Sequence, residues 1–340
     1  MKDPVFEISK KKIIKKYNEL KNLNLKVSYS VKTNPDITSI LEEDTDSLFS
    51  IHSLKEADYV KDKSKIMFFT QALDKGLLDN LIEKGIDKIV VDNKEDLDII
   101  EAYINEKKVK LELTLRMKLK EHTIFTEKYF VYGMGSDLVN DAVLRLKDKV
   151  SKIGVHIHKK SQNVSEWSFK EELVDTLRKE VLEKLDFVNI GGGLPVKYKN
   201  SSDRYIDSIF EKLKELRDWL GEYNIESYIE PGRFIAANAG VLKVYVKSIL
   251  DENIIIVNAS VYNTIPDILN ANVKLLIECE GEGNEYRIKG CTPTRDDIFR
   301  YSVNLRNVKK GDELIFLNAT AYNYYSDFCS LEKIKTKIVE

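Results

Sequence analysis

The stretch KVSYSVKTNP, Lys26 to Pro35, decides the fold class because it reads as a buried strand with a charged side chain at its end. Apolar residues alternate with serines as far as Val31, and Asn34-Pro35 ends the run. Lys32 follows the apolar segment directly, where packing alone requires no ammonium group. The stretch therefore predicts a β-strand with a lysine at its carboxyl end. An ordinary solvated lysine is the alternative.

Further apolar runs follow, and most are separated from the next by a charged segment with helical periodicity. The expected strands are Val27–Val31, Ser47–Ile51, Lys65–Phe69, Lys88–Val91, Lys110–Met117, Lys152–His158, Phe187–Ile190 and Glu226–Ile229. The expected helices are Asp36–Glu43, a segment from Leu54, Lys75–Glu83, Lys94–Asn105, Glu171–Glu183 and Arg204–Leu220, with a less regular connection after Met117. Eight βα repeats in roughly 200 residues favour a (β/α)8 barrel over an open sheet.

The pattern of apolar and polar residues changes after Glu230, where helical periodicity largely stops. The strand-like runs there are Val241–Ile249, Ile254–Ser260, Val273–Glu278, Tyr286–Lys289 and Glu313–Phe316. They predict a second, mainly β domain, to which we expect Val5–Ile8 to add a strand. The predicted domains are a barrel over residues 10–235 and a β-rich domain formed by 1–9 with 236–340.

The composition excludes several classes of function. The 54 Lys+Arg residues nearly balance the 56 Asp+Glu residues, so no strong field favours nucleic acid or an anionic membrane. No apolar run is long enough to span a bilayer, and the N-terminus shows no signal-peptide core. The three cysteines are scattered, and neither they nor the four histidines have metal-site spacing. We expect a cytoplasmic protein without a metal centre.

Chemistry in such barrels occurs at the carboxyl ends of the strands. Besides Lys32, these ends carry Arg116, His158, Gly191–Gly193 and Glu230-Pro231-Gly232-Arg233. An amine can form a Schiff base with a carbonyl cofactor, and a glycine turn can approach a phosphate closely. A carboxylate can keep a pyridine nitrogen protonated, which completes the electron sink of pyridoxal 5'-phosphate (PLP). Each residue alone has a structural explanation, but their shared position favours the functional one.

The segments YSVKTNP, GVHIHKKSQ, FVNIGGGLP, YIEPGRF and NATAYNYYSDF occur in this order. Together they resemble the PLP-dependent decarboxylases of the alanine-racemase-like (fold type III) barrel family, which includes ornithine, diaminopimelate and carboxynorspermidine decarboxylases. The resemblance covers nearly the whole chain. It implies a TIM-like barrel with a mainly β domain, PLP as cofactor, and a homodimer whose shared active site is completed by a loop of the second subunit. Lys289–Phe299, KGCTPTRDDIF, corresponds to that loop.

The resemblance also implies a role for each matching residue. Lys32 would form the Schiff base, Glu230 would pair with the pyridinium nitrogen, and His158 would stack on the cofactor. The residues that would contact the phosphate or lie beside it are Ser161, Gly191, Gly192, Gly193, Gly232, Arg233 and Tyr322. Arg116 would pack near the cofactor, and Phe328 would border the substrate pocket.

Two departures from the family pattern leave the reaction and the substrate open. The family loop commonly reads G-x-x-C-x-x-x-D. Aligning Gly290 and Asp297 with the two ends of that pattern places Pro293 at the position of the cysteine, which is implicated in protonating the substrate carbon. Either Cys291 serves as that acid, or another group does, or the chain is not a decarboxylase. The second departure is Ser50, because the ornithine-type enzymes tend to have an acidic residue there.

The substrate-binding candidates are Asp267, Asp296 and Asp297 for a distal amine and Arg295 for a distal carboxylate. Some of these residues could instead cap a turn or face solvent. The leading hypothesis is decarboxylation of an α-amino acid of the diamino or polyamine type. The alternatives are an amino-acid racemase of the same fold, against which Glu230 argues, and a non-catalytic PLP-binding homologue.

Overall fold

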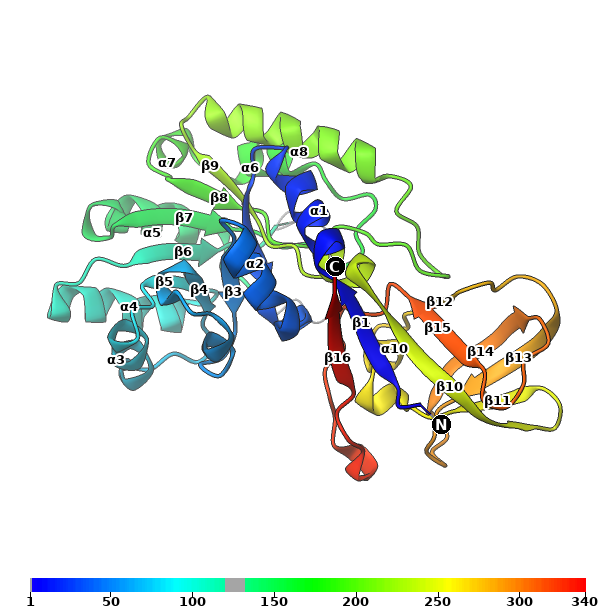
Figure 1. The fold of residues 1–340 in the computed structure, drawn as a ribbon. Helices are drawn as coiled ribbons and strands as arrows, with labels where there is room; N and C mark the ends of the chain where they lie inside the picture. The colour runs from blue at the N-terminus through cyan, green and yellow to red at the C-terminus, as the bar shows by residue number, and fades with distance from the viewer. Residues whose placement is uncertain (1, 120–131) are drawn as a thin grey trace. The chain divides into compact units, whose positions relative to one another are not determined.

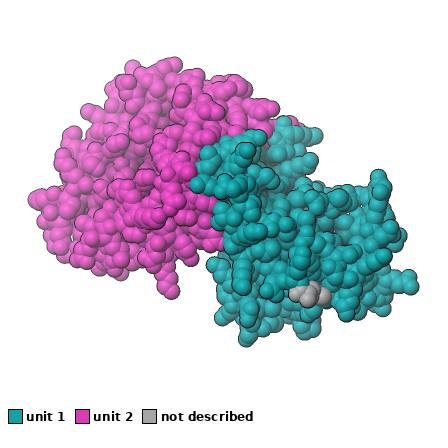
Figure 2. Space-filling view, in the orientation of Figure 1, with its two compact units in different colours: residues 1–16, 195–204, 232–340 teal, residues 17–194, 205–231 magenta. Residues whose placement is uncertain are grey.

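The structure is a computed structural model that describes residues 2–119 and 132–340. The chain forms two compact units, which Figure 2 colours separately. The barrel unit (unit 2) comprises Tyr17–Leu194 and Tyr205–Pro231. The sheet unit (unit 1) comprises Met1–Lys16, Pro195–Arg204 and Gly232–Glu340.

The barrel unit is a closed barrel of eight parallel strands in the order β2 to β9 (Figure 1). The strands are β2 Lys26–Ser30, β3 Leu48–Ile51, β4 Ile66–Phe69, β5 Lys88–Val91, β6 Glu112–Arg116, β7 Lys152–His156, β8 Phe187–Asn189 and β9 Glu226–Ile229. The associated helices are α1 Lys10–Lys21, α2 Thr38–Asp44, α3 Lys75–Glu83, α4 Lys94–Lys107, α5 Ser136–Leu146, α6 Phe169–Thr176, α7 Lys179–Leu182 and α8 Ile206–Gly221. The predicted (β/α)8 barrel is therefore confirmed.

Two of the expected helices are different in the structure. The segment from Leu54 forms only a short 3-10 turn, Glu56–Tyr59. The helix expected over Glu171–Glu183 is broken into α6 and α7, because Leu177 and Arg178 adopt extended backbone conformations. After Met117, residues 120–131 of the less regular connection lie outside the described residues, and the chain resumes before α5.

The sheet unit contains an eight-stranded sheet (Figure 1). Its strands are β1 Val5–Ser9, β10 Gly240–Leu250, β11 Ile254–Val257, β12 Leu276–Ile277, β13 Asn284–Lys289, β14 Ile298–Leu305, β15 Glu313–Leu317 and β16 Lys335–Val339. Its helices are α9 Arg233–Ala236 and α10 Asp267–Asn270. As predicted, the N-terminal strand joins this sheet: β1 pairs antiparallel with β10 and parallel with β16. The sequence did not predict β14 or β16.

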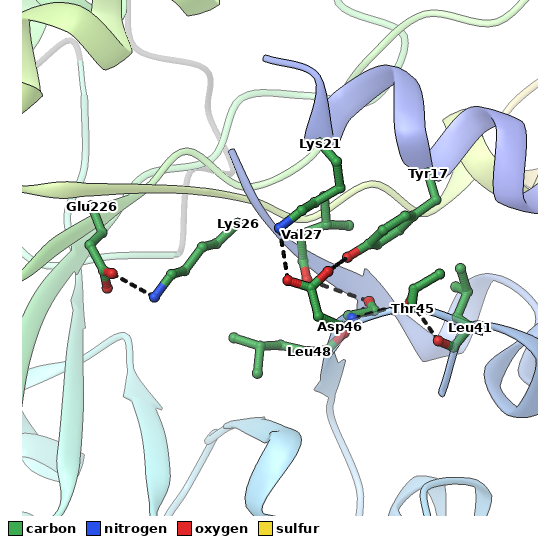
Figure 3. A network of polar contacts seen from close by, with 10 residues as sticks. Tyr17, Lys21, Lys26, Val27, Leu41, Thr45, Asp46, Leu48 and Glu226 are labelled. Carbon is green, nitrogen blue, oxygen red and sulfur yellow. Dashed lines mark hydrogen bonds and ion pairs between the residues drawn. The ribbon is translucent and has the colours of Figure 1, made fainter. Parts of the chain in front are cut away.

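A polar network lies at the amino ends of the first barrel strands (Figure 3). The Tyr17 hydroxyl donates to Asp46 Oδ1 at 2.5 Å, and Lys21 Nζ donates to Asp46 Oδ2 at 2.8 Å. Lys26 forms an ion pair with Glu226 at 2.5 Å, so this end of β2 is also tied to β9. These contacts stabilise the end of the barrel that is opposite the strand carboxyl ends. Among the described residues, no helix combines the length and the apolar character that crossing a bilayer requires.

Candidate active site

Lys32 projects from a short turn immediately after β2. The 3-10 turn Val31–Thr33 follows the strand, with Val31 and Thr33 buried and the lysine exposed. The Asn34 side chain accepts the backbone N–H of Asp36 at 3.0 Å, and the Tyr29 hydroxyl donates to the Asn34 carbonyl at 3.0 Å. These two bonds fix the turn, so the amine lies at the carboxyl end of the barrel.

The surroundings of Lys32 lower the pKa of its ammonium group. Desolvation by the barrel wall lowers the pKa of the Lys32 amine, and the positive charge of Arg116 adds to this effect. Glu230 and Glu56 act in the opposite direction, but the net pKa stays below that of an ordinary lysine. The neutral amine is the nucleophilic form, so this environment suits a lysine that attacks a carbonyl group.

His52 lies within hydrogen-bond distance of this amine, and the sequence did not point to a role for it. It follows β3 directly, and its Nε2 lies 3.3 Å from Lys32 Nζ. The ring stacks on Phe69 at the end of β4, with centroids 5.1 Å apart. The only sequence signal was a polar ring at the carboxyl end of a buried strand, the same signal that selected Lys32.

Glu230 follows β9 and is buried, with its two carboxylate oxygens held by side chains from β3, β7 and β8. Its Oε1 accepts from Ser50 Oγ at 3.0 Å and from Asn189 Nδ2 at 2.8 Å, and its Oε2 lies 3.2 Å from His156 Nε2. Burial alone raises the pKa of Glu230, but its electrostatic interaction and hydrogen bond with His156, together with the hydrogen bond from Asn189, outweigh it. They lower the pKa of Glu230 to about 2, so the carboxylate is ionised.

His156 is the neutral partner of this carboxylate. Desolvation lowers the pKa of the fully buried imidazole, although Glu230 acts in the opposite direction. The buried Nδ1 has no hydrogen-bond partner, so a proton on it would be left unsatisfied. The ring therefore carries one proton, on Nε2, and donates it to Glu230. Both histidines lie in the segment GVHIHKKSQ, but only the second, His158, has a role implied by the resemblance.

His158 lies beyond the end of β7, which stops two residues earlier than expected. Its Nδ1 accepts the backbone N–H of Gly192 at 3.1 Å, so the neutral ring carries its proton on Nε2. Burial, with repulsion from His156 and Arg116, lowers the pKa of His158 to about 3. Its ring is nearly parallel to that of His156, with an interplanar angle of 10°.

The glycine turn after β8 packs so closely against its neighbours that side chains would clash there. Gly191 and Gly193 have φ values of +64° and +103°, and a Cβ at Gly191 would lie 2.4 Å from His158 Nδ1. A Cβ at Gly192 would lie 2.6 Å from the Glu230 carbonyl oxygen. The Gly193 carbonyl accepts the N–H of Asn163 at 2.9 Å, which ties this turn to the loop that contains exposed Ser161.

Arg116 ends β6 and is half-buried. Its guanidinium lies 5.0 Å from the centroid of the Tyr132 ring, which is a cation–π distance. In the barrel unit, the structure therefore brings the predicted residues Lys32, Arg116, His158, the glycine turn and Glu230 to the carboxyl ends of the strands.

In the sheet unit, the predicted residue Arg233 lies at the centre of a buried cluster of side chains. Its Nη1 forms an ion pair with Asp267 Oδ2 at 2.7 Å and donates to the Tyr198 hydroxyl at 3.2 Å. The guanidinium also lies 4.6 Å from the centroid of the Tyr322 ring. Asp267, a candidate for a substrate amine, thus has Arg233 as its partner in this structure. Gly232 precedes α9 directly.

The loop between β13 and β14 is organised around Asp297. This carboxylate is fully buried and accepts from Val261 N at 2.9 Å, Thr292 N at 3.0 Å and Thr292 Oγ1 at 2.7 Å. A Cβ at Gly290 would lie 2.1 Å from Asp297 Oδ1, which explains the glycine at that position. These contacts support the alternative considered above, in which this aspartate caps a turn.

The rest of the same loop is more open. Pro293, Arg295 and Asp296 are exposed, and Cys291 is half-buried. Desolvation, with repulsion from Asp297, raises the pKa of the Cys291 thiol, which therefore stays protonated at neutral pH. A cavity of about 720 Å³ in the sheet unit is lined by Tyr262, Asp296, Phe299 and Tyr301, among others. The exposed ring of Phe328 lies 4.5 Å from that of Tyr262.

In the parts of the chain that the structure describes, no three His, Cys, Asp or Glu side chains gather as metal ligands. The chemistry offered by the barrel mouth is that of an amine, an ionised carboxylate and a glycine turn. Such a barrel, with these groups at its strand carboxyl ends, defines the class of PLP-dependent barrel enzymes.

Comparison with known proteins identifies the family. The pyridoxal binding domain of pyridoxal-dependent decarboxylases matches residues 10–237, and the chain belongs to this family. It is 29% identical over 201 residues to diaminopimelate decarboxylase of Bacillus methanolicus, covering 52% of this chain and 46% of that one. For the enzyme of Staphylococcus aureus (strain COL) the identity is 28% over 309 residues, covering 84% and 72%. The chain spans about half the length of several curated relatives that it matches.

Solved structures share the fold. Lysine decarboxylase from Selenomonas ruminantium superimposes with a TM-score of 0.86 at 20% identity, covering 99% of this chain and 93% of that one. Lysine/ornithine decarboxylase complexed with cadaverine from Vibrio vulnificus gives a TM-score of 0.80 at 20% identity, covering 99% and 94%. At this identity the likeness establishes the fold alone.

The residues of the barrel mouth fit the family's cofactor, PLP. Lys32 offers an amine whose pKa is lowered, and Glu230 offers an ionised carboxylate that can hold a pyridinium proton. Gly191 and Gly192 have no side chain over the backbone of the turn, which suits the close approach of a phosphate to backbone N–H groups. The donor set and the glycine turn therefore agree with the family assignment.

Proposed function

We propose that this chain is a PLP-dependent decarboxylase that acts on an α-amino acid of the diamino or polyamine type. The observation that carries the proposal is the buried Glu230 carboxylate, which is held ionised by hydrogen bonds in the same barrel mouth as Lys32. When bound, PLP supplies the electron sink that allows a bond at the substrate Cα to break. A carboxylate beside the pyridine nitrogen favours full use of that sink, which suits decarboxylation better than racemisation.

The proposed roles of the protein groups follow from their environments. Lys32 binds the cofactor through its amine, and Glu230 holds a proton on the pyridine nitrogen. His158, fixed by Gly192, stacks on the ring, and the glycine turn with Ser161 binds the phosphate. Cys291 is the proposed proton donor to Cα, since its raised pKa keeps the thiol protonated. The roles of Arg116, Gly232, Arg233 and Tyr322 toward the cofactor remain predictions.

The proposed substrate class rests on the relatives. Their names include diaminopimelate decarboxylase and, in Dictyostelium discoideum, a probable ornithine decarboxylase that is 26% identical over 249 residues. These amino acids carry a second amine, which Asp296 could receive from the exposed part of its loop. Arg295, also exposed, could receive a second carboxylate, and Phe328 could border the substrate.

Release of CO2 from a panel of amino acids tests the proposed function. The panel contains meso-diaminopimelate, ornithine, lysine, arginine and carboxynorspermidine, and Lys32→Ala is the inactive control. We expect CO2 from at least one member with the wild-type chain and none with the variant. Loss of optical rotation without gas would establish a racemase instead. PLP binding without any turnover would indicate a non-catalytic homologue.

We further propose a homodimer that works in the cytoplasm, with 10–235 as the PLP-binding domain and 1–9 with 236–340 as the β-rich domain. The family match over residues 10–237 supports the domain boundary. A shared active site predicts that mixing Lys32→Ala with Cys291→Ser chains restores activity, because some mixed dimers contain one intact site. Sedimentation of the wild-type chain measures its oligomeric state.

A further inference from the structure

His52 occupies a position that the proposed chemistry has not used. It follows β3, twenty positions along the chain from Lys32, yet its Nε2 lies 3.3 Å from the lysine amine. The distance is within hydrogen-bond range and places a titratable group directly on the reactive nitrogen. An imidazole is the side chain best suited to exchange protons near neutral pH.

The ring of His52 is held in place from two further sides. On one side it stacks on Phe69, with an interplanar angle of 20°. On the other side, Nδ1 lies 3.6 Å from Glu56 Oε2, and the backbone N–H of His52 donates to the same carboxylate oxygen at 2.5 Å. Against the effect of burial, these contacts lower the pKa of Glu56, which is therefore a carboxylate beside the imidazole. The result is a chain of three groups: amine, imidazole and carboxylate.

We propose that His52 is a catalytic acid–base partner of Lys32. Its Nε2 accepts a proton from the Lys32 ammonium and later returns it, while Glu56 stabilises the imidazolium through Nδ1. One N–H bond breaks at Nζ and one forms at Nε2, so the step needs no other reactant. This inference rests on the proposed function, because it concerns the amine that would bind PLP.

The step answers a requirement of the proposed chemistry. A lysine amine must lose a proton before it attacks a carbonyl and must regain one when it is displaced. Glu230, ionised and buried, is occupied by Ser50, Asn189 and His156. His52 contacts the amine directly and is exposed enough to exchange protons with solvent.

Other charges near the pair shape its pH dependence. The Lys32 amine interacts electrostatically with Glu230, Glu56 and Arg116. The Phe69 ring contacts both His52 and His156, and His52 also affects the pKa of His156. The two carboxylates favour a proton on the pair, whereas the guanidinium disfavours it. The test must therefore change one group at a time.

A titration of the full chain without PLP tests the coupling. The His52 ring is followed by NMR in the wild type, Lys32→Met, Glu56→Gln and the control Asp58→Asn, which removes an exposed carboxylate from the same 3-10 turn. Removal of an ammonium at 3.3 Å should move the His52 ring signals, at a given pH, toward those of the protonated imidazole. Glu56→Gln should move them toward those of the neutral ring, and the control should leave them unchanged. Identical titrations in wild type and Lys32→Met would overturn the proposal.

The rate at which the PLP-free chain takes up PLP provides a second readout. His52→Gln should slow the appearance of visible absorbance by about 100-fold at neutral pH and move the half-maximal rate to higher pH. Asp58→Asn should behave as wild type. An unchanged rate and pH profile in His52→Gln would contradict the inference. If the wild-type chain develops no absorbance, the proposed function fails, whereas the NMR coupling still decides whether His52 and Lys32 exchange a proton.

Discussion

Glu230 is charged in its buried site, whereas the two histidines beside it are neutral, because the hydrogen-bond partners of the three side chains differ. The carboxylate accepts from Ser50 and Asn189, so its charge is compensated although water is excluded. The buried Nδ1 of His156 has no partner, and the Nδ1 of His158 is committed to an N–H of the backbone. The site thus holds the negative charge of Glu230 and disfavours a positive charge on His156 or His158. This is the electrostatic arrangement that a pyridinium ring needs.

These histidines predict how stability depends on pH. The pKa of His158 is lowered to about 3, and that of His156 is lowered as well, so below pH 6.5 the unfolded chain binds protons that the folded chain does not. The free energy of unfolding should be highest above about pH 6.5. On acidification it should fall by up to about 1.4 kcal/mol per pH unit for each histidine. Urea unfolding between pH 7.5 and 4.5 measures this, and His158→Gln should give a shallower slope. Equal slopes would contradict the burial argument.

Glu112 is a buried carboxyl group at the start of β6 whose Oε1 has no hydrogen-bond partner. Desolvation raises its pKa, against the attraction of Lys88 and Lys152. A raised pKa means that stability is present at low pH and is lost as the pH rises through the folded-state value. Glu112→Gln should therefore stabilise the chain by about 1 kcal/mol at pH 8 and by less at pH 5. Urea unfolding at both pH values checks this, and a destabilised variant at pH 8 would refute it.

At the scale of elements, the loop from β13 to β14 depends on Asp297 for its shape. Because this carboxylate accepts three hydrogen bonds within the sheet unit, Asp297→Asn should destabilise the protein by about 2 kcal/mol. Asp296→Asn, in the exposed part of the same loop, is the matched control and should leave stability unchanged. Urea unfolding separates the two. If Asp297→Asn raises KM without a loss of stability, Asp297 contacts the substrate instead.

The amino ends of the first barrel strands depend on Tyr17. Its hydroxyl donates to Asp46 (Figure 3). Burial of the phenol, together with the hydrogen bond to the Asp46 carboxylate, raises the pKa of Tyr17. Tyr17→Phe removes one charge-assisted hydrogen bond and should cost about 1.5 kcal/mol of stability. Thermal unfolding measures the loss, while CO2 release per folded chain should not change, because the network lies at the end opposite Lys32. A loss of specific activity would contradict that separation.

The elements predicted well are those whose sequence pattern and burial agree. The barrel strands were found because short apolar runs ended at turn residues, as in β5, which matches its predicted bounds. β14 was missed because IFRYSVNL interleaves charged and polar residues, several of them exposed, in an edge strand of the sheet unit. The helix expected from Leu54 failed because the Glu56 carboxylate accepts the N–H of His52 and is held beside that ring, and the segment forms only a 3-10 turn.

Site residues were predictable where their own position carried the signal. Lys32 and Glu230 stand out as charges at the ends of apolar strands, so one strand is enough to find each. His52, Asn189 and the partner of Asp267 depend on contacts between strands or loops far apart in the chain, such as the ion pair of Arg233 with Asp267. Local patterns do not contain such pairings, which arise only when the barrel closes and the sheet unit folds.

At the scale of the whole molecule, the barrel carries both the family match and the proposed cofactor-binding groups at the carboxyl ends of its strands. The family match covers the barrel and its connections, residues 10–237, whereas the loop that departs from the family pattern lies beyond it. Most of the residues proposed to bind the cofactor therefore lie in the matched region, whereas the proposed reaction and substrate also depend on residues of the sheet unit.

The visible absorbance of the purified chain after addition of PLP decides whether Lys32 holds this cofactor. We expect an absorbance band from PLP bound through Lys32, stable to dialysis, that is abolished in Lys32→Ala. The matched control Lys55→Ala, which changes an exposed lysine near the end of β3, should retain it. A wild-type chain without the band, or a Lys32→Ala variant with the same band, would show that Lys32 does not bind PLP.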